Sequence, residues 1–410
     1  MVAMPRLETI CDRISSGGTP SRKITEFFTT ESSGHLWVKS KELLDCSIND
    51  TEEKISEEGL NNSAAKYFPA HSILIAMYGA NVGQLGWLRR PATVNQAIAG
   101  LVVDESKADW RFVFYSLFHT RGDLTIQAQG AAQQKLNQDL IRQFSIALPP
   151  LPVQQRIAGI LSAYDELIEN SQRRIRILEA MARALYREWF VHFRFPGHEN
   201  HPRVASPLGE IPQGWEVKSI QRFGIVITGK TPSKANADFY GNDMPFVKTP
   251  DMHGNMFILG TSDSLSMAGA ESQANKTLPA GSICVSCIGT IGVVSITTGD
   301  CQTNQQINSV VLAKQASREF LFLRLQDARQ ALENLGANGA TMGNVNKGKF
   351  EAMEIACPPD DLLARYHRLV EPMFSETLSL FRQIANLRRT RDLLLPRLLS
   401  GQVGLKTQAV

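Results

Sequence analysis

Apolar residues recur at alternating intervals of three and four positions in two long stretches of this chain. In the first stretch, between Pro152 and Trp189, the pattern runs without a break and includes a single serine. Its positions are Ile157, Leu161, Tyr164, Ile168, Ser171, Ile175, Leu178, Ala182, Leu185 and Trp189. This is the spacing of the a and d positions of a coiled coil, so it predicts one amphipathic helix of about five heptads.

The second stretch lies 209 residues further along the chain. Its positions are Tyr366, Val370, Met373, Thr377, Leu380, Ile384, Leu387, Arg391, Leu394 and Leu398. Pro152 suits the first turn of the first helix, Asp360 is a candidate N-cap of the second, and Gly401 is a candidate C-terminal stop. Pro372 predicts a kink, and Pro396 predicts a kink or an early helix end. One such stripe also fits a long core helix, but two of matched length favour an antiparallel coiled coil.

The same shift of about 209 residues aligns much of the remaining chain. The matched segments include 17–21 (GGTPS) with 229–233 (GKTPS), 37–39 (WVK) with 246–248 (FVK), 95–96 (NQ) with 304–305 (NQ), and 136–137 (LN) with 345–346 (VN). Chance produces isolated matches, but not a series in the same order at a nearly constant offset. We therefore predict a tandem duplication of a unit of about 200 residues, related by an internal pseudo-twofold repeat.

The parts outside the two helices mix two kinds of pattern. Residues 72–78 and 308–312 are short apolar runs typical of buried strands, whereas 110–121 and 318–335 have helical spacing. The predicted class is therefore α+β, with two globular domains separated by the helices. The predicted division is 1–149, first globular domain; 150–195, central helix; 196–214, breaker-rich linker; 215–358, second globular domain; 359–401, C-terminal helix; and 402–410, tail.

Composition narrows the class of protein. The chain has 43 Lys+Arg against 40 Asp+Glu, and 43% of its residues are hydrophobic, which excludes wholesale disorder. The six cysteines are scattered and the chain is long enough to bury a core without disulfides, so we expect a reducing compartment. The N-terminus lacks a signal-peptide pattern, and no apolar run approaches the length of a membrane span. We expect a soluble, cytoplasmic protein with no membrane partner.

Two short motifs suggest chemistry that their context disfavours. Residues Gly224 to Thr231 match the pattern of a phosphate-binding loop, but no apolar helical pattern follows, and the equivalent residues 13–19 lack the first glycine and the lysine. What the two halves share is a Gly-x-Thr-Pro-Ser turn. Cys284 and Cys287 have the spacing of a zinc pair without the second pair that zinc requires, so we expect buried free thiols. We predict no catalytic residue, cofactor site or metal site in this chain.

Two similar modules joined to paired rigid helices suit a ligand with two related subsites, and duplex DNA is the natural candidate. Polar and basic residues in the loops are candidate DNA contacts, although solvated surface is the alternative for each. The candidates are Arg22, Lys23, Lys39, Lys41, Gln133, Gln134 and Lys135 in the first half, and Lys230, Lys234, Lys248, Asn344, Asn346 and Lys347 in the second. Every basic residue of the helical stretches is arginine, which suits interhelical salt bridges and a docking protein partner.

Three segments resemble the central region of the specificity subunits of type I restriction–modification systems. They are 148–157 (LPPLPVQQRI), 184–190 (ALYREWF) and 208–215 (LGEIPQGW), and 394–401 (LLPRLLSG) resembles the C-terminal signature of that family. The start of the second helix, 360–365 (DDLLAR), departs from the usual Gln-Gln-x-Ile. The resemblance covers essentially the whole chain.

The resemblance implies that domains 1–149 and 215–358 are target-recognition domains, each reading one half of a bipartite DNA site. It implies that the helices set the gap and dock two modification subunits, which bind S-adenosylmethionine and methylate adenine, and that two restriction subunits add ATP- and Mg-dependent cleavage. This chain itself would be non-catalytic. Helices of about 55 Å would limit the gap to about 16 base pairs. The alternatives are a specificity subunit of a related modification system, a nucleotide-binding protein using Gly224 to Thr231, and a protein scaffold that never contacts DNA.

Overall fold

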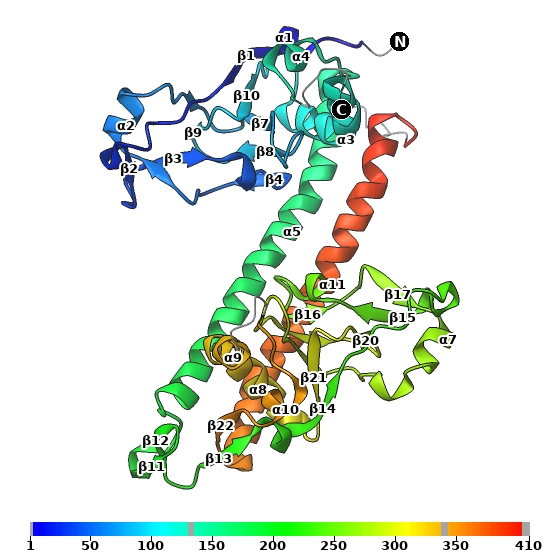
Figure 1. The fold of residues 1–410 in the computed structure, drawn as a ribbon. Helices are drawn as coiled ribbons and strands as arrows, with labels where there is room; N and C mark the ends of the chain where they lie inside the picture. Colours follow the sequence, from blue (N-terminus) through cyan, green and yellow to red (C-terminus); the bar gives the residue numbers. More distant parts are fainter. Residues whose placement is uncertain (1–2, 130–134, 338–342, 404–410) are drawn as a thin grey trace. The chain divides into compact units, whose positions relative to one another are not determined.

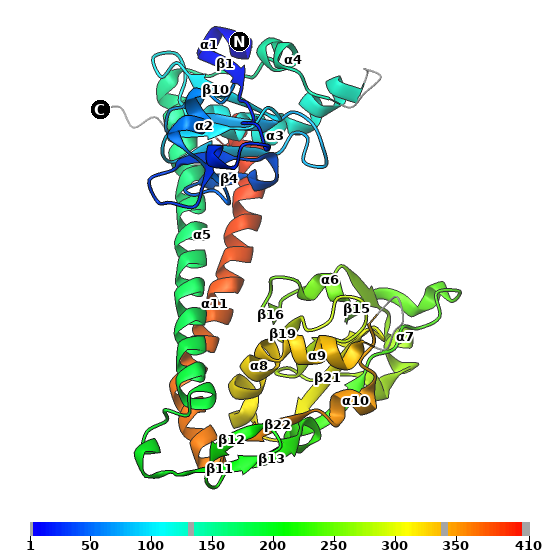
Figure 2. The ribbon, with the colours of Figure 1, turned by 60° about the vertical axis from the view of Figure 1, so that its left-hand side comes forward.

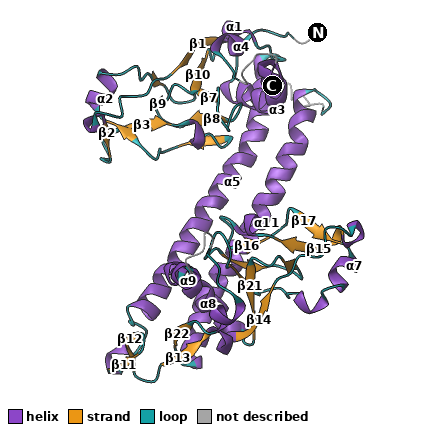
Figure 3. Ribbon diagram, viewed as in Figure 1, coloured by secondary structure: helices purple, strands orange, loops and turns teal. Residues whose placement is uncertain are grey.

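The computed structural model describes residues 3–129, 135–337 and 343–403. The described chain forms two compact units: one is drawn from Met1–Glu169 and Ala385–Val410, and the other is Asn170–Ile384. Each unit combines β-sheets with helices (Figures 1 and 3), which confirms the predicted α+β class. The boundary between the units falls inside both long helices.

The first unit contains two five-stranded sheets. The sheet with the longer strands, which we call the larger sheet, has the order β1-β10-β7-β8-β4. The smaller sheet has the order β2-β5-β3-β9-β6. The strands are β1 (Cys11–Ser16), β2 (Phe28–Thr29), β3 (His35–Val38), β4 (Cys46–Ile48), β5 (Lys54–Ile55), β6 (Tyr67–Phe68), β7 (Ile73–Ala76), β8 (Leu85–Leu88), β9 (Ala92–Val94) and β10 (Ile98–Val103). The shorter helices are α1 (Leu7–Ile10), α2 (Glu57–Asn61), α3 (Trp110–Gln129) and α4 (Gln138–Gln143).

The second unit repeats this arrangement. Its five-stranded sheet has the order β14-β21-β18-β19-β16, beside a three-stranded sheet β17-β15-β20 and the pairs β13-β22 and β11-β12. The strands are β11 (Arg203–Ser206), β12 (Gly209–Pro212), β13 (Glu216–Ser219), β14 (Gly224–Thr228), β15 (Tyr240–Val247), β16 (Phe257–Ile258), β17 (Asp263–Leu265), β18 (Ile283–Ser286), β19 (Val294–Thr297), β20 (Gln302–Thr303), β21 (Ile307–Leu312) and β22 (Glu354–Cys357). The shorter helices are α6 (Thr249–Met252), α7 (Met267–Glu271), α8 (Arg318–Asp327), α9 (Arg329–Gly336) and α10 (Lys347–Glu351).

Strand pairing and helix capping confirm the internal repeat. In the larger sheet of the first unit and in the five-stranded sheet of the second, three neighbouring pairs are antiparallel and the edge pair, β4-β8 or β16-β19, is parallel. Asn137 caps α4 and Asn346 caps α10, each by accepting a hydrogen bond from the third residue of its helix. Ser56 and Ser266 do the same for α2 and α7. The duplicated sequence therefore folds twice into the same set of elements.

The long helices are α5 (Leu151–Tyr186), which ends in a π-helical turn over Arg187–Val191, and α11 (Asp360–Leu399). In the second unit Arg174 of α5 pairs with Glu376 of α11, while the Tyr366 hydroxyl donates to the carbonyl of Ala182. Residue numbers thus rise along one helix as they fall along the other, so the helices are antiparallel there. Figures 1 and 2 show them side by side within each unit.

The ends of the helices follow the sequence closely. Pro152 lies in the first turn of α5, as predicted. Gly401 adopts a left-handed φ of 73° just beyond α11, and this is the helix stop that was expected of it. Asp360 is the first residue of α11 rather than its N-cap, and α11 continues through both Pro372 and Pro396 to Leu399. Neither proline ends the helix.

Both helices contribute to the core of each unit. In the first unit Ile157 and Leu161 of α5 and Leu398 of α11 belong to the apolar cluster formed by the larger sheet and α3. In the second unit Tyr186 and Tyr366 belong to the cluster that contains α8. Burial of these apolar side chains stabilises the packing of each globular part against its portion of the helix pair.

Candidate functional site

Four loop segments lie side by side at one edge of the five-stranded sheet in the second unit. The amide of Lys230 donates to Thr303 O at 2.9 Å, Cys287 N donates to Gln306 O at 2.7 Å, and Val345 N donates to Cys287 O at 2.9 Å. The first unit repeats all three bonds at Gly18–Val94, Met77–Ala97 and Leu136–Met77. We call these segments the loop strips: 17–23, 78–83, 95–97 and 135–138 in the first unit, and 229–235, 288–292, 304–306 and 344–347 in the second.

Both loop strips are basic and free of acidic residues. The first carries Arg22, Lys23 and Lys135, the second carries Lys230, Lys234 and Lys347, and neither contains Asp or Glu. All six side chains belong to exposed residues. Because the whole chain is nearly neutral, two strips without acidic residues of their own are local features. Their four cations that form no ion pair within the described residues, Lys23, Lys135, Lys230 and Lys234, suit an anionic ligand.

A close backbone contact explains the repeated Gly-x-Thr-Pro-Ser motif. A Cβ atom on Gly17 would lie 1.8 Å from Val94 O, and one on Gly229 would lie 2.1 Å from Asn304 O. Neither distance leaves room for a side chain, so glycine is required at both positions. The turn is therefore fastened to the neighbouring Asn-Gln segment in both units.

A side-chain hydrogen bond adds a second tie between the same two segments. The Thr231 hydroxyl donates to Gln305 Oε1 at 2.6 Å, and Thr19 donates to Gln96 Oε1 in the first unit. Neither glutamine was among the predicted contacts. The signal was available, because the Asn-Gln pair is one of the segments that align at the repeat offset.

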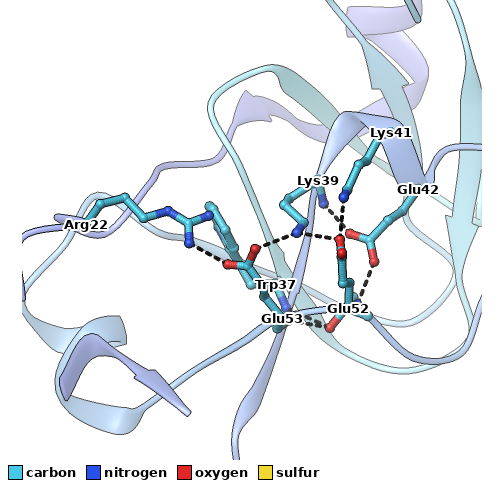
Figure 4. A network of polar contacts seen from close by, with 8 residues as sticks. Arg22, Trp37, Lys39, Lys41, Glu42, Glu52 and Glu53 are labelled. Atoms are coloured by element: carbon cyan, nitrogen blue, oxygen red, sulfur yellow. Dashed lines mark hydrogen bonds and ion pairs between the residues drawn. The ribbon is translucent and has the colours of Figure 1, made fainter. Parts of the chain in front are cut away.

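Three predicted DNA contacts meet in one ion-pair network instead of standing free (Figure 4). Lys39 Nζ bonds Glu52 at 2.7 Å and Glu53 at 2.6 Å; Arg22 pairs with Glu53 at 2.7 Å, and Lys41 with Glu52 at 2.6 Å. The hydrogen bonds from Lys39 and then Lys41 lower the pKa of Glu52 to about 2. The Lys39 side chain is only 12% exposed, so its charge is largely committed to this network.

The second unit has the same lysine–acid arrangement at Lys248. Its side chain pairs with Asp263, and its backbone amide donates to Asp251 Oδ2 at 2.8 Å, as Lys39 N donates to Glu42 Oε2 at 2.7 Å. These lysines lie outside the loop strips. In both units the lysine at this position bonds acidic residues of its own unit.

The remaining candidates divide between the loop strips and the undescribed segment. Lys23, Lys135, Lys230 and Lys234 form no ion pair within the described residues, whereas Lys347 pairs with Glu351 at 3.4 Å. Asn344 is exposed, and the Asn346 side chain caps α10. Gln133 and Gln134 lie outside the described residues.

Every residue of the two predicted helix seams is buried or half-buried. The one charged residue among them, Arg391, bonds Asp165 at 2.5 Å, and Asp165 also accepts from the Tyr115 hydroxyl at 2.5 Å. Burial, and then the negative charge of Asp165, raises the pKa of Tyr115. Asp165 of α5 thus accepts hydrogen bonds from Arg391 of α11 and from Tyr115 of α3, so the charged position in the seam has a hydrogen-bonded partner.

The segment that matches a phosphate-binding loop and the cysteine pair lie in strands or directly after them. Gly224–Thr228 is strand β14, paired along its length with β21, so the segment is not a loop that leads into a helix. Cys284 lies in β18 and Cys287 follows it, and both are buried free thiols, as expected. Burial raises the pKa of Cys284 to about 12 and that of Cys287 to about 11.

Neither a membrane-spanning helix nor a cluster of metal ligands occurs in the described part of the chain. None of its helices is both long enough and apolar enough to cross a membrane. Within residues 3–129, 135–337 and 343–403, no three His, Cys, Asp or Glu side chains gather as a metal site would require.

Comparison with known proteins gives consistent matches. Residues 14–180 and 212–361 match the family described as type I restriction modification DNA specificity domain. The HindI type I restriction enzyme specificity subunit of Haemophilus influenzae is 34% identical over 322 residues, which cover 65% of this chain and 70% of that protein. The MjaIX specificity subunit of Methanocaldococcus jannaschii is 25% identical over 406 residues, covering 96% and 91%.

A solved structure shows the same fold. The type I restriction–modification S subunit from M. genitalium aligns with a TM-score of 0.63 at 12% identity, covering 97% of this chain and 95% of that one. At this identity the match concerns the fold alone.

Proposed function

Because the chain belongs to the family of type I restriction–modification specificity subunits, we propose that each unit reads one half of a bipartite site in duplex DNA through its loop strip. The observation that carries this proposal is the duplication of the strip. Two copies of one acid-free, basic surface suit two places on one polyanion.

The composition of the strips supports both parts of DNA recognition. Lysine and arginine side chains contact phosphates and fix the register, while asparagine, glutamine and lysine can read base edges in the major groove. The two strips differ at exposed positions: Lys135 of the first corresponds to Asn344 of the second, and Lys23 corresponds to Ala235. Such differences would let the two units read different half-sites.

We further propose that α5 and α11 set the gap between the half-sites and dock two modification subunits. The buried seams support a rigid helix pair. On α5, Ile177 is 53% and Met181 50% exposed, one helical turn apart, which suits a protein partner. In this scheme the chain is non-catalytic, and partner subunits bind S-adenosylmethionine, ATP and Mg²⁺.

A selection experiment tests the proposal. The chain, purified together with its modification subunits, is mixed with randomised duplexes, and the bound fraction is sequenced. We expect two short conserved sequences separated by a constant gap. Recovery of unselected DNA, or of a single undivided site, would overturn the proposal and favour a scaffold that does not read DNA.

The nucleotide-binding alternative has no comparable support. Its segment is a strand in a sheet, and the same sheet occurs in the first unit without the lysine. Cytoplasmic location remains our expectation from the sequence.

A further inference from the structure

The threonine and glutamine of the hydrogen-bonded pair occur in both loop strips, with Thr19 exposed and Thr231 half-buried. Thr19 and Gln96 in the first unit correspond to Thr231 and Gln305 in the second, whereas Lys23 and Ala97 correspond to Ala235 and Gln306. Both glutamines are exposed. Exposed polar residues retained in two diverged copies need an explanation that applies equally to both.

The surrounding contacts fix each glutamine in one orientation. The side chain of Asn304 accepts from the amide of Gln306 at 3.1 Å, and that of Asn95 accepts from Ala97 at 3.1 Å, so the turn carrying the glutamine is closed on itself. The threonine hydroxyl then occupies the amide oxygen. The bond takes one of the two lone pairs of that oxygen and fixes the plane of the amide, and the NH₂ group, which can only donate, has no hydrogen-bond partner within the described residues.

The fixed amide favours some DNA atoms over others. A bidentate pair with adenine needs the amide oxygen and nitrogen together in the plane of the base, whereas here the threonine hydroxyl sets the amide plane and only the NH₂ group has both hydrogens available. The remaining acceptors are phosphate oxygens and the acceptor atoms of base edges. Base contacts carry specificity and should differ between units that read different half-sites, whereas a phosphate is present in every half-site.

We infer that Gln96 and Gln305 each donate a hydrogen bond to a phosphate oxygen of the DNA backbone, one in each half-site. They anchor the register of the recognition units without reading sequence, and Thr19 and Thr231 are positioning residues that orient them. This inference rests on the proposed function and names the chemical group that the strip binds.

Three variants separate this role from a purely structural one. Gln305→Glu keeps the oxygen that accepts from Thr231 but removes both donors, Gln305→Met removes the donors without adding charge, and Thr231→Val removes only the tie. On the complex with modification subunits, we expect Gln305→Met to weaken binding about ten- to a hundredfold on all sequences, with the selected site unchanged. Gln305→Glu should weaken it at least as much, and Thr231→Val less.

A duplex with modified phosphates identifies the phosphate that the glutamine contacts. It also avoids the negative charge that Gln305→Glu adds to the protein. Replacing single phosphates of the selected site by neutral methylphosphonates should identify one position at which wild-type binding falls and Gln305→Met binding does not fall further. Gln96→Met should show the same behaviour at one phosphate of the other half-site. The test remains valid if the glutamate variant fails to assemble.

Three outcomes would overturn the inference. Wild-type affinity for Gln305→Glu would show that the glutamine only holds the turn. A change of the selected base at one position would show a base contact. If Gln305→Met and the methylphosphonate weakened binding additively at every position, a phosphate partner would be excluded. If the wild-type complex itself selected no bipartite site, the proposed function would fail first, and the two failures are therefore distinguishable.

Discussion

Arg391 of α11 donates from Nη1 to Oδ1 of Asp165 on α5 across 2.5 Å, at the one charged position of the two helix seams. The other carboxylate oxygen of Asp165 accepts from Tyr115 of α3. Because Arg391 is 15% and Asp165 31% exposed, each would be costly to leave without a partner.

Arg391→Leu should therefore destabilise the protein although it makes the seam more apolar. We expect the free energy of unfolding to fall by about 1–3 kcal/mol, because Asp165 loses its charged partner. The double variant Arg391→Leu with Asp165→Asn should recover part of that loss in a thermal-unfolding cycle. Asp392→Asn, at the exposed second partner of Arg391, is the matched control and should change little.

The ion pair between Lys39 and Glu52 should make the stability of the first unit depend on pH in the acid range. The pKa of Glu52 is about 2 in the folded protein against an ordinary 4.5, so the folded state binds its proton less readily than the unfolded chain. The stability contributed by this group is fully present above about pH 4.5 and is lost as the pH falls toward 2. The difference in melting temperature between wild type and Lys39→Met should shrink over that window.

The matched control is Lys41→Met, since Lys41 also pairs with Glu52 but its side chain is 61% exposed. Its effect should be smaller at every pH. An equal effect of both substitutions, independent of pH, would contradict this account of the network.

Gly229→Ala should displace the turn that carries Lys230 and Thr231. The added methyl would overlap Asn304 O, so the turn must move or strain, at about 1–3 kcal/mol. We expect a lower melting temperature and weaker DNA binding by the assembled complex. Gly299→Ala adds the same methyl where no atom lies within 4 Å, and it should leave both quantities near wild type.

Lys230→Ala distinguishes DNA binding from nucleotide binding. We expect weaker binding to all duplexes and a slope of log K against log salt that falls by about one, because one phosphate contact is lost. Lys314→Ala removes an exposed lysine outside the strip, which pairs with Asp360, and should preserve the slope. Measurable ATP binding by the wild type that disappears in Lys230→Ala would instead favour the nucleotide hypothesis.

Removing one heptad from each long helix should change the gap and nothing else. Seven residues shorten a helix by about 10.5 Å, equivalent to about three base pairs, and keep the seam in phase. Selection from randomised duplexes should return the same half-sites with a shorter gap. Loss of one half-site, or an unchanged gap, would contradict the proposed role of α5 and α11.

Local sequence patterns were sufficient to predict the two long helices and the internal duplication. The seams repeat every three and four residues, a periodicity that the helix itself imposes, and the positions of Pro152 and Gly401 depend on backbone preferences that a few residues carry. The repeat is a property of the order of residues and needs no structure to detect.

Contacts between residues far apart in the chain determine the strand order and the partners of the charged side chains. Strand β1 pairs with β10 nearly ninety residues away, and no local signal selects that partner over the neighbouring apolar runs. The sequence shows Arg22, Lys39 and Lys41 as three available cations, but folding places Glu52 and Glu53 between them and commits their charges. Whether a charge is free for a ligand depends on which opposite charges the fold brings near it.

The same distinction explains the glutamines of the loop strips. Their recurrence as an Asn-Gln pair is visible in the chain, but the orientation of the amide depends on a threonine hydroxyl 74 residues away from Gln305. Repetition along the chain identifies residues that matter in both halves. The chemistry that each residue presents follows from the atoms that folding brings into hydrogen-bonding distance.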